Sequence, residues 1–164
     1  MIGYAAVAII TSREGKMLFI RRRENPSDPW SGDIAFPGGR KKDVDLDFLD
    51  TVYREVWEEV GINLRDMDIL PITLGIFTPL SYPDLKVYAY VFWIDGRPKV
   101  RKGGEVGEVF WIDVENLVRS RCRRYLRALK VYREVDCFRY RDLVIWGMTY
   151  RILNSFLSIY YPGV

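Results

Sequence analysis

The pattern of apolar and polar residues along the chain predicts a series of β-strands separated by turns. Apolar or alternating runs rich in Val, Ile, Tyr and Phe are bounded by Gly, Pro, Asp and Ser, as is typical of strands. Glu14 and Gly15 stand between the first two runs and predict a hairpin turn there. The predicted strands occupy residues 4–11, 16–22, 69–77, 86–94, 108–111, 131–140 and 143–145.

A longer periodicity predicts a helix over residues 48–60. Asp47 and Asp50 stand where a helix prefers an N-cap and a first-turn acid, and Gly61 stands where a helix ends in a left-handed residue. Two further helices are predicted over 114–129, in one or two pieces, and over 148–160. The apolar positions of the first helix share one face and are Leu49, Val52, Val56 and Val60.

Strands that alternate with a few helices predict an α/β layered sandwich. The chain has 164 residues, 49% hydrophobic and 29% charged, which suits one globular domain spanning 1–164. The net charge of +3 is too small to indicate nucleic-acid binding by itself. Cys122 and Cys137 lack metal-ligand spacing and predict no disulfide scaffold. No signal segment or membrane anchor is expected, so the expected compartment is the cytoplasm.

Three glutamates lie on the face of the first helix that is opposite its apolar residues. Glu55, Glu58 and Glu59 are spaced by three and four residues, which places their side chains in one stripe. Like charges at these spacings repel by ~0.2–0.5 kcal/mol a pair, and a divalent cation would offset that repulsion. The alternative is a solvated acidic face. The glycine-rich turn at 37–39, which lets the backbone approach a ligand, favours the cation.

These residues resemble the signature of the Nudix hydrolases, Gly-x5-Glu-x7-Arg-Glu-U-x-Glu-Glu-x-Gly-U, where U is a bulky aliphatic residue. Residues 54–62 match its second half, whereas the first half has Asp45 for Glu and one extra residue before Arg54. This expansion, the lead-in at 32–37 and the segment at 145–153 are similar to the coenzyme A pyrophosphatase branch. Trp30 and Asp33 depart from that branch, which usually has His and Gln there.

The resemblance implies a Nudix-type α/β/α sandwich with a mixed sheet and a metal-dependent active site. Glu55, Glu58 and Glu59 would bind Mg²⁺ or Mn²⁺, for which carboxylate oxygens are suitable ligands. Arg54 would orient the glutamates, and a carbonyl of Gly38 or Gly39 would complete the coordination. Because the chain contains no histidine, a carboxylate or a metal-bound hydroxide must activate the attacking water.

Other candidate residues lie outside the signature. Glu105 and Glu108 follow the glycines at 103–104, a position from which Nudix enzymes often draw a further ligand or base, and the resemblance favours Glu105. The alternative is a solvated turn. The expected substrate-binding residues are Arg23, Trp30 and Arg40. Asp45 is a minor candidate for the acidic position of the signature and would otherwise cap the helix.

A basic cluster lies in the predicted helix over 114–129 and at the residue that follows it. It either holds phosphate or a polynucleotide, or forms a solvated helix with ion pairs to nearby acids, and the general behaviour of charge runs favours the solvated helix. The three consecutive arginines at 21–23 offer the same choice, and one of them is expected to reach a diphosphate. The cluster consists of Arg119, Arg121, Arg123, Arg124, Arg127 and Lys130.

The expected activity is hydrolysis of a nucleoside diphosphate linked to another group. Coenzyme A, cleaved to 3′,5′-ADP and 4′-phosphopantetheine, is the leading substrate. ADP-ribose and nucleoside triphosphates, including oxidised ones, are the alternatives within the family. A hypothesis of another class is a Nudix-like module that binds RNA or a partner without chemistry, and the intact acidic residues of the signature argue against it. The expected partner is therefore a small nucleotide, with nucleic acid unlikely, no membrane, and a homodimer possible.

Overall fold

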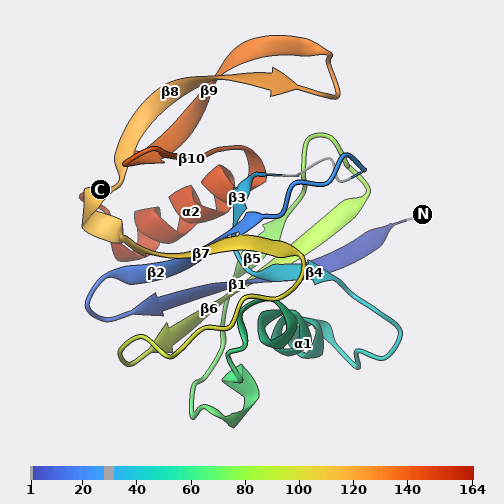
Figure 1. Cartoon of the computed structure of the whole chain (residues 1–164), viewed down its shortest axis with the longest axis vertical. Coiled ribbons are helices and arrows are strands. Elements are labelled where there is room, and N and C mark those ends of the chain that lie inside the picture. The colour runs from blue at the N-terminus through green and yellow to red at the C-terminus, as the bar shows by residue number, and fades with distance from the viewer. Residues whose placement is uncertain (1, 28–31) are drawn as a thin grey trace.

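The computed structural model describes residues 2–27 and 32–164. Its first two strands, the strand at Leu85–Ile94 and the helices at Phe48–Val60 and Gly147–Tyr160 follow the prediction, with a mixed sheet at the centre (Figure 1). The helices in this part of the chain are α1 (Phe48–Val60) and α2 (Gly147–Tyr160), with 3₁₀ turns at Leu64–Asp66 and Val114–Asn116. The strands are β1 (Gly3–Ser12), β2 (Lys16–Arg22), β3 (Ile34–Ala35), β4 (Gly38–Arg40), β5 (Ile72–Phe77), β6 (Leu85–Ile94), β7 (Val106–Asp113), β8 (Val118–Leu126), β9 (Val131–Tyr140) and β10 (Leu143–Ile145).

The central sheet has the strand order β3-β2-β1-β6-β5, with β4 added to β1 and β7 added to β2. Strands β1 and β6 run parallel from Gly3↔Leu85 to Ser12↔Ile94. The other strand pairs of this sheet are antiparallel, so the sheet is mixed. Both β1 and β6 lie in the middle of the sheet, which explains their long apolar sequences.

The two helices cover opposite faces of this sheet (Figure 1). Alternate residues of β1 contribute to different cores: Ile9 packs with α2, whereas Ala8 and Ile10 pack with α1. Phe156 of α2 and Val56 of α1 are fully buried in these two cores. The predicted α/β/α sandwich is therefore confirmed. Among the described residues, no helix is long and apolar enough to cross a membrane.

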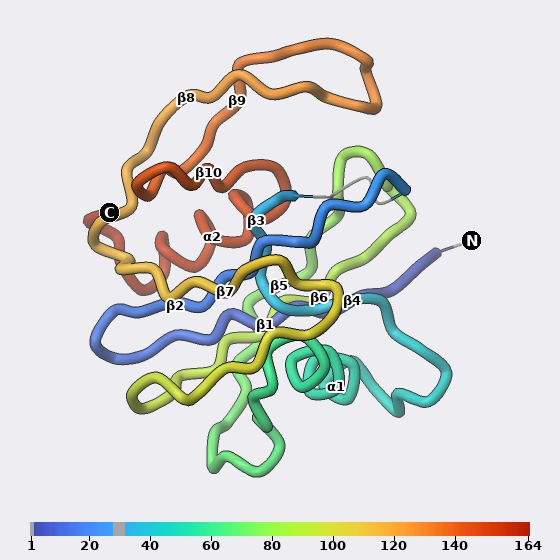
Figure 2. The backbone as a smooth tube through the Cα atoms, viewed as in Figure 1, coloured from blue at the N-terminus to red at the C-terminus, as the bar shows by residue number. Residues whose placement is uncertain are grey.

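The predicted helix over 114–129 is wrong. Residues 114–116 form a single 3₁₀ turn, and residues 118–126 form β8, which pairs with β9 along its whole length. The hairpin β8–β9 extends from the body of the protein as an arm, coloured orange in Figures 1 and 2. Pairing with β9 outweighs the helix propensity of the arginines and leucines, since propensity is a weak preference that tertiary contacts override.

The arm also contains a disulfide that the sequence analysis did not expect. Cys122 of β8 and Cys137 of β9 are bonded, with Cα atoms 6.1 Å apart. The hairpin register places Cys122 opposite Val135 and Cys137 opposite Ser120, so the two cysteines are diagonal neighbours. A helix over 114–129 would not have paired with β9 in this register, which is why the spacing alone did not suggest the bond.

Candidate active site

Helix α1 presents the acidic residues from a fixed position. Its first turn is capped by Asp47, whose side chain accepts a hydrogen bond from the Asp50 amide at 2.8 Å. Its last turn ends at Gly61, which has a left-handed φ of 70°. Val52 and Val56 are fully buried against the sheet. Both predicted caps are confirmed. The face of the helix that carries the glutamates points away from the buried valines and lines a cavity.

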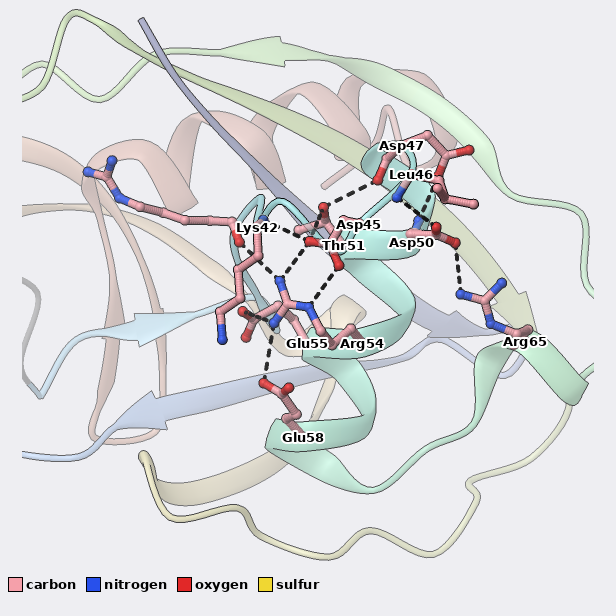
Figure 3. A network of polar contacts seen from close by, with 11 residues as sticks. Lys42, Asp45, Leu46, Asp47, Asp50, Thr51, Arg54, Glu55, Glu58 and Arg65 are labelled. Carbon is pink, nitrogen blue, oxygen red and sulfur yellow. Dashed lines mark hydrogen bonds and ion pairs between the residues drawn. The ribbon is translucent and has the colours of Figure 1, made fainter. Parts of the chain in front are cut away.

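Arg54 is the centre of an ion-pair network at the start of the site (Figure 3). Its Nε donates to Asp45 Oδ1 at 2.9 Å and its Nη2 to Asp45 Oδ2 at 2.8 Å, a bidentate pair. Its Nη1 donates to Glu55 at 2.9 Å and to Glu58 at 3.4 Å. Arg54 therefore links the Asp45 loop to two glutamates of α1.

Asp45 anchors this arginine rather than capping the helix. Its carboxylate is 4% exposed and also accepts hydrogen bonds from the Thr51 hydroxyl and the Lys42 amide, both at 2.9 Å. The hydrogen bonds from Arg54 hold the pKa of Asp45 well below its usual range. The same hydrogen bonds raise the pKa of the Arg54 guanidinium. The minor candidate of the sequence analysis thus has a defined structural task.

Glu55 and Glu59 lie deeper than Glu58. Glu59 is 5% exposed, and its Oε1 accepts a hydrogen bond from the Gly38 amide at 2.7 Å. Burial is the main cause that raises the pKa of Glu59 to about 8, and the charge of Glu55 adds to it. Burial also raises the pKa of Glu55. The site therefore concentrates carboxylates where negative charge is disfavoured unless a cation is near.

Gly39 allows this close arrangement. A Cβ on Gly39 would lie 2.6 Å from the Glu55 Cδ, far inside van der Waals contact. Strand β4 places Gly39 opposite Ala6 of β1, so its backbone is fixed in the sheet and cannot move aside. The glycine turn recognised in the sequence is thus a strand that passes directly beside a glutamate of α1.

The loop at residues 101–105 closes the other end of the site. The Arg101 amide donates to the Val60 carbonyl at 2.8 Å, and the Gly103 amide donates to the Glu59 carbonyl at 2.9 Å. These bonds satisfy carbonyls that a helix leaves unpaired at its C-terminus. A Cβ on Gly103 would lie 2.1 Å from the Glu58 carbonyl oxygen, so the loop can approach only with glycine there. The helix end therefore fixes the position of Glu105.

Two neighbouring cavities meet at Gly104 and Glu105. One, of about 270 Å³, is lined by Lys42, Glu55, Glu58, Glu59, Gly104 and Glu105. The other, of about 320 Å³, is lined by Arg22, Arg23, Asn25, Gly104 and Glu105. The first is rich in carboxylates and the second in guanidinium groups. Their junction joins a site suited to a cation with a site suited to phosphate.

The carboxylate cavity suits a hydrated divalent cation. Of its six described lining residues, four are glutamates and one is a lysine, so hard oxygen donors with excess negative charge face the space. Within 2–27 and 32–164, no three acidic, His or Cys side chains converge on one point. Mg²⁺ does not require such convergence, because it usually keeps several waters and binds through one or two carboxylates. The donor set therefore fits the expected metal.

The remaining candidates are not all brought to the cavities. Glu108 forms an ion pair with Arg21 at 3.3 Å and does not line either cavity. The Arg40 carbonyl accepts from Arg54 at 3.1 Å, while an Arg40 guanidinium nitrogen lies 3.1 Å from where a Cβ on Gly3 would be. Arg23 lines the arginine cavity and donates to the Gly104 carbonyl at 2.9 Å. Trp30 lies outside the described residues.

Three residues that line the cavities were not among the individual site residues expected from the sequence. Lys42 lies in the loop before α1, Asn25 follows the arginine run, and Gly104 contributes its backbone to both cavities. Lys42 and Asn25 sit in polar loop sequences that resemble ordinary surface loops. Only the folded arrangement, in which these loops flank the end of α1, distinguishes them.

Comparison with known proteins agrees with this arrangement. A family model described as the NUDIX domain matches residues 1–134. The human mitochondrial coenzyme A diphosphatase NUDT8 is 25% identical over 150 residues, which cover 90% of this chain and 64% of that protein. The chain thus spans less than two thirds of that relative.

Solved structures share the fold. A MutT/nudix family protein from Enterococcus faecalis has a TM-score of 0.69 at 17% identity, covering 97% of this chain and 62% of that one. A bifunctional NMN adenylyltransferase/ADP ribose pyrophosphatase from Francisella tularensis, complexed with AMP and a Mn ion, has a TM-score of 0.61 at 15% identity. It covers 97% of this chain and 42% of that chain. The family model, which matches well over half of the residues, identifies the chain as a member of the Nudix family.

Proposed function

We propose that this chain is a metal-dependent pyrophosphohydrolase that cleaves a nucleoside diphosphate linked to another group. The junction of the carboxylate cavity with the arginine cavity at Gly104 and Glu105 carries this proposal. A diphosphate placed across the junction would have one phosphate beside the glutamates and its neighbour beside Arg22 and Arg23. Charge-assisted hydrogen bonds from the arginines would hold the phosphate oxygens in place.

Glu55, Glu58 and Glu59 are the proposed ligands of Mg²⁺ or Mn²⁺, with a carbonyl of Gly38 or Gly39 as a further candidate. When bound, such a cation offsets charge on phosphate oxygens and lowers the pKa of bound water. Arg54 is a positioning residue, since it contacts Glu55 at 2.9 Å and Glu58 at 3.4 Å and is itself held by Asp45. The Mn complex of the Francisella relative supports the same class of metal.

Glu105 is the proposed base. It is the one glutamate that lines both cavities among the described residues, so a water that attacks a phosphorus of a diphosphate bound across the junction would lie beside it. Accepting a proton from that water is a role that acts in the transition state. Glu108 is assigned no such role, because its carboxylate is paired with Arg21.

Coenzyme A is the proposed substrate. The supporting observations are the expanded signature, the matching segment at 145–153 and the likeness to human NUDT8, which carries the name of a coenzyme A diphosphatase. ADP-ribose, as in the name of the Francisella relative, and nucleoside triphosphates are the alternatives within the family. A binding module without chemistry would have no need of buried carboxylates whose pKa values are raised.

A substrate panel tests the proposal. Coenzyme A, ADP-ribose and a set of nucleoside triphosphates are incubated with the protein in Mg²⁺, in Mn²⁺ or in a chelator, and the products are separated by chromatography. We expect 3′,5′-ADP and 4′-phosphopantetheine, formed only with metal. Glu105→Gln should lower kcat by about 10²-fold or more with little change in KM, whereas its matched control Glu108→Gln should change kcat less than threefold. Metal-independent turnover, or a larger loss in Glu108→Gln, would contradict these assignments.

A further inference from the structure

The small net charge of the chain hides a strong separation of charge. Residues 118–141, which contain the β8–β9 arm, carry nine basic and two acidic side chains, a net charge of +7. Because the whole chain has +3, the other 140 residues carry −4. The arm projects from the body in Figures 1 and 2, so its positive charge is gathered on one protruding element. The total charge therefore understates the attraction that this element exerts on polyanions.

The hairpin register divides the basic residues between two faces. Side chains alternate along each strand, and directly paired residues share a face. On the first face, Arg121 pairs with Asp136 at 2.8 Å, and Arg123 lies opposite Glu134 and over the ring of Tyr132. This face agrees with the interpretation that the arginines are matched by nearby acids.

The second face has no such match. Arg124 lies directly opposite Arg133, and the neighbouring pairs are Cys122↔Val135 and Leu126↔Val131. Like charges directly opposite one another destabilise an antiparallel pair. The Nε of Arg124 is buried and has no hydrogen-bond partner among the described residues. Arg127 and Lys130, in the turn at the tip, extend this charge beyond the strands.

An arrangement that sets two like charges opposite one another, with no acid among the paired residues of the same face, suits an anion supplied from outside. We infer that the Arg124 face of the β8–β9 arm binds the phosphate backbone of a single-stranded nucleic acid. This site is separate from the two cavities at α1, none of whose described lining residues belongs to the arm.

A polynucleotide fits the arm better than a free nucleotide. The nine residues of β8 span ~30 Å, and the basic side chains are distributed along that length rather than gathered around one point. Two exposed rings stand near the tip on the Arg121 face, Tyr125 at 45% and Tyr132 at 57% exposure, with centroids 5.2 Å apart. A strand that follows the Arg124 face to the basic residues of the tip would reach these rings there, and exposed aromatic rings are the usual means of stacking unpaired bases.

Fluorescence anisotropy with the full chain tests this inference. The probes are a labelled 20-nucleotide single-stranded RNA, the same length of single-stranded DNA, and a duplex, titrated at several salt concentrations. Arg124→Gln with Arg133→Gln is the test variant. Arg121→Gln with Arg123→Gln is the matched control, because it removes the same charge from the other face. All four residues lie outside the proposed catalytic machinery, so metal-dependent hydrolysis serves as a control for folding.

We expect the unmodified chain to bind single strands with an affinity that falls steeply with salt. The test variant should lose tenfold or more in affinity, and its salt slope should fall by about 1.4, which corresponds to two phosphate contacts of ~0.7 each. The control variant should lose threefold or less. Removing the like-charged pair should leave the melting temperature unchanged or higher.

Three results would overturn the inference: no binding of any strand at low salt, equal losses in the two variants, or tighter binding to vesicles containing phosphatidylserine than to either single strand. The first would show that the charge has no polyanion partner of this kind. Equal losses would mean that net charge alone attracts the strand. Preference for vesicles would assign the arm to a lipid surface. Each result leaves the proposed hydrolysis untouched, because that reaction is measured separately.

Discussion

Glu59 combines burial with a charge that the fold itself does not neutralise. The residue is 5% exposed, and its carboxylate accepts a hydrogen bond from the Gly38 amide. Burial raises its pKa from an ordinary value of 4.5 to about 8. Ionising Glu59 therefore costs free energy in the metal-free protein, and a bound cation would remove that cost. Under the proposed function, stability is given up here for a charge that binds the metal.

This predicts how metal-free stability depends on pH. A carboxyl group whose folded pKa is raised destabilises the fold above its unfolded pKa, so the cost begins near pH 4.5 and grows until about pH 8. In chelator, Glu59→Gln should be more stable than the unmodified chain at pH 8, by on the order of a few kcal/mol, and similar to it at pH 4.5. Urea unfolding at both pH values measures the difference.

The same variant should have lost most of its metal-dependent turnover, because glutamine keeps the size and the Gly38 contact but not the charge. Mg²⁺ should raise the melting temperature of the unmodified chain and not that of Glu59→Gln. If the variant were less stable than the unmodified chain at pH 8, the carboxylate would be stabilised by the protein alone, and its assignment as a metal ligand would fail.

At the residue scale, the sequence predicted the placement of the three glutamates on one cavity, because spacing alone determined it. Glu55, Glu58 and Glu59 belong to one helix, so their common stripe follows from helical geometry. The ion pair between Asp45 and Arg54 depends on how the loop before α1 folds back onto the helix. The length of that loop does not determine its path. Lys42 and Asn25 were missed for the same reason. A residue on a loop is placed by contacts that are distant in sequence.

At the element scale, the loop that caps α1 joins the helix to both cavities of the candidate active site. Its Gly103 amide bonds to the Glu59 carbonyl, and the next residues reach both cavities. A Cβ at Gly103 would meet the Glu58 carbonyl at 2.1 Å, while a Cβ at Gly104 would meet nothing within 4 Å. The two neighbouring glycines therefore make a matched pair for testing the position of the loop.

We predict that Gly103→Ala lowers kcat/KM by tenfold or more, because the loop must move away from the helix and carry Glu105 with it. Gly104→Ala should stay within about threefold of the unmodified chain. Steady-state kinetics on the best substrate measures both, and circular dichroism checks that the fold is kept. Equal effects in the two variants would mean that the loop has no fixed position to lose.

The arm is the element that the sequence placed in the wrong class. The alternation of apolar and polar residues along β8 is obscured, because arginine occupies positions on both faces of the strand. The stretch therefore has no apolar periodicity that would identify it as a strand. By contrast, α1 and the long central strands were predicted because each has a clear apolar face or is buried on both faces. Where the pattern of burial is strong, sequence determines the element; where it is weak, the partner strand does.

The disulfide in the arm should stabilise that element and not the active site. Cys122 and Cys137 are separated by 15 residues, and closing a loop of that size contributes about 3 kcal/mol in the chain-entropy description. Reduction, or Cys122→Ser with Cys137→Ser, should therefore speed amide hydrogen exchange in 118–140 while leaving α1 unchanged. Mass spectrometry of exchanged peptides compares the two regions. Faster exchange throughout the chain would show that the arm and the body unfold together.

At the scale of the whole molecule, the sandwich brings the three parts of the proposed active site together from distant segments. The end of β2 supplies arginines, α1 supplies glutamates, and the loop before β7 supplies Glu105. Strand β7 pairs with β2, and the register shifts between Arg21 and Arg22. This shift separates the side chain of Arg21 from those of Arg22 and Arg23. Arg21 then pairs with Glu108, while Arg22 and Arg23 line the cavity.

The different positions of Arg21 and Arg23 predict how replacing each arginine would change the preference between substrates. If the arginine cavity holds the additional 3′-phosphate of coenzyme A as well as one phosphate of the diphosphate, kcat/KM for coenzyme A should exceed that for dephospho-coenzyme A. Arg23→Gln should reduce that ratio by about tenfold, because a charged hydrogen bond contributes ~1.5–3 kcal/mol that the smaller substrate never gains. Arg21→Gln, whose guanidinium faces Glu108, is the matched control and should leave the ratio unchanged.

Comparing the ratio, rather than activity alone, separates recognition from structure. Arg23 also donates to the Gly104 carbonyl, so its loss can shift the Glu105 loop and slow both substrates equally. A general fall in kcat/KM with an unchanged ratio would assign Arg23 to the loop and leave the 3′-phosphate to another residue. A ratio near one in the unmodified chain would refute coenzyme A as the preferred substrate, while metal-dependent cleavage of the diphosphate would still stand on its own measurement.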